Sequence, residues 1–142
     1  IGRALGTRAG AFLDDNNECA CVVTRLDEQV KTERYITATR KSGDALLFQT
    51  LAHNKKDRNM EPFVVTLKNE SYNHKSELSS HEGEEFIYVL NGIVGVAVGK
   101  DYYTLKTGDS IYYDSVVPHN VHSADGVDAS ILVVMYIPHN LP

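Results

Sequence analysis

Short runs of apolar and β-branched residues recur along the chain from residue 20 onward, separated by polar segments that contain Gly, Asp, Asn or Ser. Runs of this composition are typical of β-strands, and the segments between them are typical of turns. The pattern predicts strands over residues 22–23, 35–39, 46–51, 62–67, 102–105, 110–113, 120–122 and 131–137. Many short strands without a long helix indicate an all-β sandwich or barrel.

A further pair of strands is predicted over residues 86–98, where apolar residues flank Asn91 and Gly92. Asn-Gly is the preferred pair for a type I′ turn, because both central positions of that turn require a positive φ. We therefore expect the strands before and after Asn91-Gly92 to pair directly as a hairpin.

Residues 1–14 follow a different pattern, with apolar side chains at roughly helical spacing. Gly6 follows Leu5 as a helix C-terminal glycine does, and Thr7 is a suitable cap for a second short helix. The polar run that ends at Glu18 is typical of a linker. We expect residues 1–18 to be a short helical remnant plus a linker, and residues 19–142 to form the β domain. Because the chain starts at Ile1, we expect it to be a piece of a longer protein.

Composition fits a single globular domain and narrows the partners. The chain has 142 residues, of which 42% are hydrophobic and 23% charged, and its net charge is −5. Proteins that bind nucleic acid on their own usually carry a basic surplus, so this chain is not expected to contact DNA by itself. No membrane segment and no secretory signal are recognised, which favours a cytoplasmic location without a membrane partner. Cys19 and Cys21 are expected to be ordinary thiols.

Two local motifs stand out in the second half of the chain. The first places His81, Glu85 and Gly92 in order, and the second opens at Gly108 and ends at the Pro118–His119 step. Their spacing resembles the two motifs of the cupin superfamily, and the resemblance covers roughly residues 60–138. It implies a single cupin barrel, that is, a double-stranded β-helix or jelly roll.

The resemblance also implies a metal centre built from two histidines of the first motif, the glutamate, and the histidine of the second. This chain has Ser79 where the first of those histidines is usual, so His81, Glu85 and His119 remain as candidate ligands. Two imidazoles and one carboxylate suit a divalent transition metal such as Zn, Fe, Mn or Ni. A polar pocket floor without metal is the alternative, and both stay open here. His74 either replaces the missing ligand or lies on the surface.

Residue parity predicts the ligand pocket. If Glu85 points into the barrel, Ile87 and Val89 also do, and if His119 points inward, Val121 does too. Together with Ser79, these side chains are the expected ligand-binding residues, a polar mouth over an apolar lining. His122 lies at an odd offset from His119 and is expected to face the other way.

The function preferred from the sequence is that of a sensor domain. The Ala4–Gly6 step and its surroundings resemble the end of a helix-turn-helix domain of the phage-repressor class, and bacterial regulators that join such a domain to a cupin are a known arrangement. The resemblance implies a small-molecule effector, DNA contact only through the missing N-terminal domain, and a homodimer. No catalytic residue is assigned, and a non-enzymatic role is favoured.

Two other functions stay open. A metal at the three candidate ligands would support an enzyme of dioxygenase or isomerase type acting on a small organic acid. A stand-alone binding protein is the third possibility, because a cupin fold hosts many activities.

Overall fold

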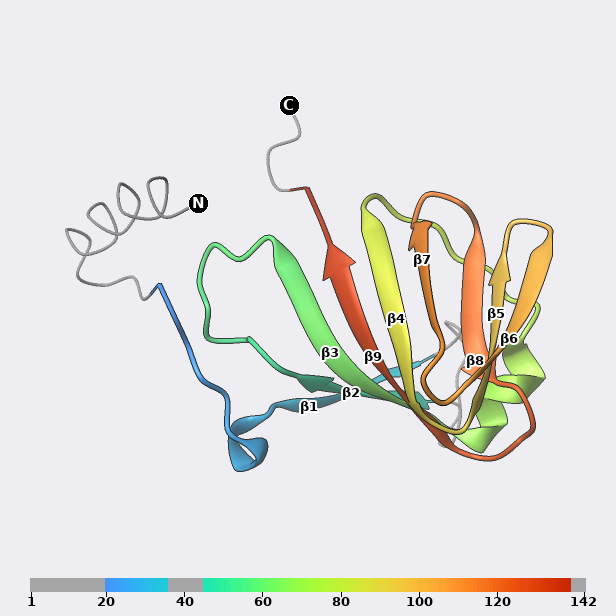
Figure 1. The fold of residues 1–142 in the computed structure, drawn as a ribbon, viewed down its shortest axis with the longest axis horizontal. Coiled ribbons are helices and arrows are strands. Elements are labelled where there is room, and N and C mark those ends of the chain that lie inside the picture. Colours follow the sequence, from blue (N-terminus) through green and yellow to red (C-terminus); the bar gives the residue numbers. More distant parts are fainter. Residues whose placement is uncertain (1–19, 36–44, 139–142) are drawn as a thin grey trace.

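The computed structural model describes residues 20–35 and 45–138, and these form two antiparallel β-sheets packed face to face (Figure 1). The larger sheet has six strands in the order β1-β2-β3-β9-β4-β7, and the smaller has three in the order β6-β5-β8. The strands of the larger sheet are β1 (Lys31–Tyr35), β2 (Ala45–Thr50), β3 (Met60–Leu67), β4 (Glu84–Asn91), β7 (Ser110–Asp114) and β9 (Ala129–Tyr136). Those of the smaller sheet are β5 (Ile93–Val98), β6 (Asp101–Lys106) and β8 (His119–Ser123).

The helical content of the described part is small. It consists of two 3₁₀ helices, η1 (Leu26–Glu28) and η2 (Asn69–His74). No helix among residues 20–35 and 45–138 is long and apolar enough to cross a membrane. The expected helical remnant and linker at residues 1–18 lie outside the described residues. The all-β fold class predicted from the sequence is confirmed.

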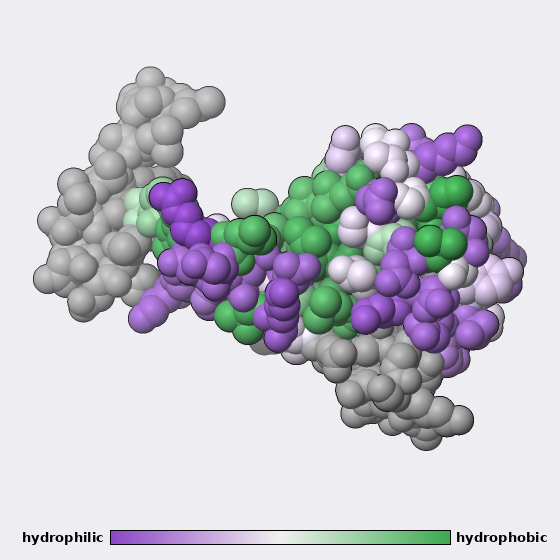
Figure 2. Space-filling model, turned by 90° about the horizontal axis from the view of Figure 1, so that it is seen from below, coloured by the Kyte–Doolittle hydropathy of each residue, from purple (hydrophilic) through white to green (hydrophobic). Residues whose placement is uncertain are grey.

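The core lies between the two sheets and follows the strand period of two. Along β3, Phe63, Val65 and Leu67 are buried while their neighbours are only partly so. Val94 and Val96 of β5 close the core from the smaller sheet, each fully buried. Figure 2 shows that hydrophobic residues are also grouped near the middle of one outer face, bordered by hydrophilic residues.

The predicted hairpin over residues 86–98 is wrong. Strand β4 pairs with β7 and β9, whereas β5 pairs with β6 and β8, so Asn91 and Gly92 carry the chain from one sheet to the other. Of these two residues, only Gly92 has a positive φ, +96°. A Cβ atom at Gly92 would lie 2.8 Å from the Cβ of Ala129, so glycine is needed here for close approach to β9 rather than for a type I′ turn.

The other predicted strands are found with shifts of a few residues, with two exceptions. Residues 22–23 form no strand. Of the strand expected at residues 35–39, only Tyr35 is described, and it is the last residue of β1. Residues 36–44 lie outside the described part.

Candidate metal centre

Three side chains from two stretches of the chain converge at one end of the space between the sheets. His81 precedes β4, Glu85 lies on β4, and His119 opens β8 of the opposite sheet. The Nε2 atom of His81 is 2.9 Å from Oε2 of Glu85, and the Nε2 atom of His119 is 3.4 Å from the same oxygen. One potential ligand atom of each residue lies within 4.8 Å of the other two. The convergence expected from the two motifs is therefore present.

Backbone pairing brings His81 next to His119. Ser79 forms an isolated antiparallel bridge with His119, in which each amide donates to the carbonyl of the other residue, at 2.9 and 2.8 Å. The amide of His81 donates to the carbonyl of Ser115 at 3.1 Å. These bonds fasten the segment before β4 to the start of β8 and to the loop between β7 and β8. The two imidazole rings meet edge to face with centroids 5.1 Å apart.

Both imidazoles are oriented by backbone carbonyls. Nδ1 of His119 lies 2.8 Å from the carbonyl oxygen of Val117, and Nδ1 of His81 lies 3.1 Å from that of Glu82. A carbonyl oxygen only accepts, so each Nδ1 must carry the proton and donate it. Each Nε2 atom consequently turns toward Glu85, which is the arrangement in which outer hydrogen bonds prepare histidines to bind a metal.

Two hydroxyl groups hold the carboxylate of Glu85, one on each oxygen. Tyr113 donates a hydrogen bond to Oε1 at 2.7 Å, and Ser115 donates one to Oε2 at 3.3 Å. Glu85, Tyr113 and Ser115 are all buried. The carboxylate therefore has one oxygen occupied by tyrosine and the other directed at both imidazoles.

Electrostatics favours charged partners within this cluster. Burial alone would raise the pKa of Glu85, but hydrogen bonds from His119 and Tyr113 and the positive charge of both imidazoles hold that pKa below its ordinary value. Burial alone would lower the pKa of His119, but the bonds to Glu85 and to the Val117 carbonyl raise it. Burial and the Glu85 carboxylate raise the pKa of Tyr113, so this phenol stays protonated and remains a donor.

The donor set fits a divalent transition metal. Two imidazole nitrogens and one carboxylate oxygen already point at a common region, and a metal ion would replace the protons that join them in the metal-free protein. A set of two histidines and one carboxylate with open positions is typical of non-haem iron(II) oxygenases. His74 does not complete the set, because its Nδ1 atom is paired with Oε2 of Glu77 at 2.7 Å.

A cavity of about 1030 Å³ opens beside the three residues, between the two sheets. Three of the four predicted ligand-binding residues, Ser79, Ile87 and Val121, line it together with the three candidate ligands. The prediction for Val89 is wrong: this side chain is fully buried in the core and does not line the cavity. The alternation of side chains along β4 indicated which face of the strand points inward, but it did not indicate how far the cavity extends along the strand.

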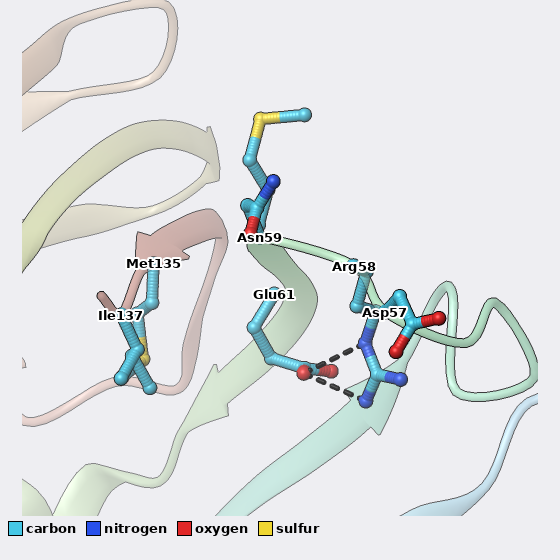
Figure 3. A pocket seen from close by; sticks show the side chains of 7 residues that line it. Asp57, Arg58, Asn59, Glu61, Met135 and Ile137 are labelled. Carbon is cyan, nitrogen blue, oxygen red and sulfur yellow. Dashed lines mark hydrogen bonds and ion pairs between the residues drawn. The ribbon is translucent and has the colours of Figure 1, made fainter. Parts of the chain in front are cut away.

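A smaller hollow of about 490 Å³ shares part of its lining with the large cavity. Figure 3 shows the residues that line it. Its main polar feature is the pair of Arg58 and Glu61, in which two guanidinium nitrogens lie 2.7 and 2.8 Å from one carboxylate oxygen. Arg58 also donates to the carbonyl of Lys55 at 2.9 Å, which fixes the loop before β3. Arg58, Glu61, Met135 and Ile137 line both hollows.

Sequence reasoning missed the residues that support Glu85. Tyr113 and Ser115 were not assigned to the site, although Tyr113 stands directly opposite Glu85 in the pairing of β4 with β7. The signal was their position in the second motif, a few residues before His119. His122 is oriented as expected, since its ring contacts Tyr102 and Tyr72 rather than the cavity, but it is fully buried.

The fold and the three converging residues define a cupin-type β-sandwich with a candidate mononuclear metal centre. Residues 70–135 match the family model of the cupin domain, which supports a place in the cupin superfamily.

Three relatives are informative. The curated (S)-2-hydroxypropylphosphonic acid epoxidase of Streptomyces wedmorensis is 25% identical over 146 residues, covering 95% of this chain and 70% of the epoxidase. A crystal structure of FeII HppE superposes with a TM-score of 0.70 at 22% identity, covering 84% of this chain and 62% of that chain. An HTH_3 family transcriptional regulator from Vibrio cholerae has a TM-score of 0.56 at 25% identity, covering 68% of this chain and 53% of that one.

These comparisons correct the functional preference drawn from the sequence. The preference for a non-enzymatic role is corrected, because the curated relative that matches 95% of this chain is an epoxidase. The similarity to a regulator concerns only the part of the regulator that superposes on this chain, 53% of its length. This chain spans less than two thirds of either solved chain, with shares of 62% and 53%.

Proposed function

We propose that this chain is a metal-dependent enzyme of the cupin type that acts on a small organic acid. The observation that carries the proposal is the convergence of His81, Glu85 and His119 on the wall of a large cavity, with both Nε2 atoms directed at one carboxylate oxygen. The similarity of 95% of this chain to a curated epoxidase supports a catalytic rather than a purely sensory role.

Iron(II) is the proposed metal, because this donor set is typical of non-haem iron oxygenases. When bound, the ion would supply Lewis-acid and redox chemistry toward the substrate and dioxygen. The residues of the chain would have separate duties: the three ligands bind, the Val117 and Glu82 carbonyls orient the imidazoles, and Tyr113 keeps Glu85 in place. The apolar part of the cavity wall would contact the apolar part of a substrate.

Metal analysis followed by oxygen uptake tests the proposal. Protein purified without added metal and then reconstituted anaerobically with iron(II) is expected to bind one ion per chain. Oxygen consumption is then measured with a panel of small hydroxy acids and phosphonic acids. Binding of one iron ion with substrate-dependent oxygen uptake supports the proposal. Failure to retain iron, zinc, manganese or nickel would overturn it, and His119→Ala is the matched variant that should neither bind iron nor consume oxygen.

A second candidate function is the sensor domain of a transcription regulator, and similarity to the Vibrio cholerae HTH_3 regulator favours it. In this alternative, residues 1–18 connect to a DNA-binding domain, an effector occupies the cavity, and the protein is a homodimer. Such coupling requires an effector that binds one arrangement of the dimer better than the other. Operator binding by the longer protein, measured with and without cavity ligands, separates the two candidates. An effect on DNA affinity without substrate turnover favours the sensor.

A further inference from the structure

The inward side chains of the larger sheet are ordered in rows that cross the strands. One row runs Glu61, Met135, Glu85 and Tyr113, as set by the pairing of β3 with β9, β9 with β4, and β4 with β7. It contains the candidate ligand Glu85 and, two strands away, the Glu61 partner of Arg58. The charged side chains that the larger sheet contributes to the cavity therefore lie in a single row at one end of the sheet.

The rows behind it are mostly apolar. The next contains Phe63, Val133 and Ile87, with Thr50 at its β2 end, and the one after it contains Phe48, Val65 and Ile131. Side chains on one face of a strand repeat every second residue, so successive rows lie about 7 Å apart. All of these side chains line the same cavity as the candidate ligands. On the wall formed by the larger sheet, the side chains therefore become less polar along the strands with distance from Glu85.

The opposite wall repeats this order. On β8, His119 is followed two residues later by Val121, which is partly buried and lines the cavity. On the other side, Phe48 and Phe63 meet edge to face with ring centroids 5.3 Å apart. A ligand whose head group contacts His119 and Glu85 would therefore have apolar side chains on both sides of the rest of its body.

We infer that the site takes an amphipathic organic acid, with an oxygen-bearing head group at His81, Glu85 and His119 and an apolar chain extending over the rows behind Glu85. The position of the head group rests on the proposed function. The position of the apolar chain rests on the apolar side chains of the larger sheet. A cavity of about 1030 Å³ has room for far more than a hydroxypropyl group. Burial of each methylene of the chain should tighten binding about fourfold.

A homologous series of ligands tests the inference. Straight-chain 2-hydroxy acids, from lactate to 2-hydroxyoctanoate, are titrated calorimetrically into cobalt(II)-loaded protein and, separately, into metal-free protein. The expected result is a fall in Kd of about fourfold per methylene. This gain should appear in both forms, because it comes from the apolar rows rather than from the metal. A Kd that does not change with chain length in either form overturns the inference.

The two forms distinguish failure of this inference from failure of the proposed function. No cobalt(II) binding, together with a chain-length gain in metal-free protein, would refute the metal centre and retain the apolar-chain site. Cobalt(II) binding with a flat series would retain the metal centre and refute the amphipathic ligand.

A substitution that narrows the cavity shows whether the apolar chain of the ligand lies in it. Val121→Phe should weaken 2-hydroxyoctanoate at least about tenfold more than it weakens lactate, because the larger ring occupies space beyond the head group. Val127→Phe is the matched control: Val127 is 61% exposed, does not line the cavity, and should leave the series as in the wild type. If circular dichroism shows that Val121→Phe does not fold, the isosteric Val121→Thr replaces it and should reduce the long-chain gain severalfold. An equal effect of Val121 and Val127 substitutions would overturn the inference.

Discussion

The hydroxyl of Tyr113 lies 2.7 Å from Oε1 of Glu85, and both residues are buried. Since Tyr113 is the donor, this carboxylate oxygen is occupied, and only Oε2 faces the two histidines. The relationship arises from cross-strand pairing, in which the two residues stand directly opposite each other on β7 and β4. Tyr113 is therefore a positioning residue that leaves Glu85 one oxygen for a metal.

Tyr113→Phe should weaken cobalt(II) binding by about 10- to 100-fold, because outer hydrogen bonds orient the ligands. The fold should be retained, since only a hydroxyl is removed. Titration followed by cobalt absorbance provides the affinity and a spectrum that reports a changed ligand geometry. Tyr112→Phe is the control: Tyr112 is exposed and donates to Glu84 rather than Glu85, so wild-type affinity is expected. Equal affinities for both variants would contradict the positioning role.

His81→Ala should reduce cobalt(II) affinity by more than about 100-fold, because a ligand is lost rather than a supporting bond. His74→Ala is its matched control, since His74 is paired with Glu77 and is not among the three converging residues. Isothermal titration of both variants under the same buffer and pH provides the comparison. Should His74→Ala cause the greater loss, the ligand set named here would be wrong.

Much of the fold could be predicted because strand formation follows a local pattern. β-Branched and apolar residues with period two indicate strands such as β3 and β9 wherever the partners lie. Which strands pair is a different matter. Asn91-Gly92 favours a hairpin locally, but β4 has a better-packed position between β9 and β7, with Ile87 and Val89 inside the core. Global burial therefore overrides the turn preference.

The candidate site was predictable only in part, for a similar reason. The approach of Glu85 and His119 followed from a resemblance between motifs, and their distance depends on the Ser79–His119 bridge, which no local pattern indicates. The role of Tyr113 depends on the register between two strands. Val89 was misplaced because alternation specifies the face of a strand and not the depth of a cavity.

His122 gives the folded protein a defined response to acid. It is fully buried, with Nε2 2.9 Å from the hydroxyl of Tyr102 and Nδ1 2.7 Å from Oδ1 of Asn120. The amide nitrogen of Asn120 donates to the carbonyls of His74 and Glu77, so its oxygen must accept from the imidazole. Nδ1 of His122 therefore carries a proton, and the lowered pKa of the ring leaves Nε2 to accept from Tyr102 at neutral pH. Burial, with a smaller contribution from the charge of Lys75, lowers the pKa of His122 to about 4 from its ordinary value of 6.5.

Stability should therefore decline as the pH falls from 6.5 toward about 4. In that window the unfolded chain binds a proton that the folded chain excludes, so the stabilisation is complete above 6.5 and is lost as the pH approaches the folded value. The contribution to the slope is at most about 1.4 kcal/mol per pH unit. Urea unfolding at several pH values should show this component in wild type and in the exposed-residue control His53→Gln, but not in His122→Gln. A pH slope unchanged by His122→Gln would contradict the assignment.

Gly95→Ala should destabilise the smaller sheet by about 1–3 kcal/mol through overpacking. Gly95 lies on β5 beneath the ring of His122, and an added Cβ atom would lie 2.9 Å from Cε1 of His122 and would also meet the Tyr102 hydroxyl. The imidazole has no free space to move into, because it is stacked on Tyr102 and bonded at both nitrogens. Chemical denaturation measures the loss. In the double variant Gly95→Ala/His122→Ala the added methyl group gains the space of the ring, so its cost should be much smaller than in the single variant. Equal costs in the two backgrounds would show that His122 does not impose glycine at this position.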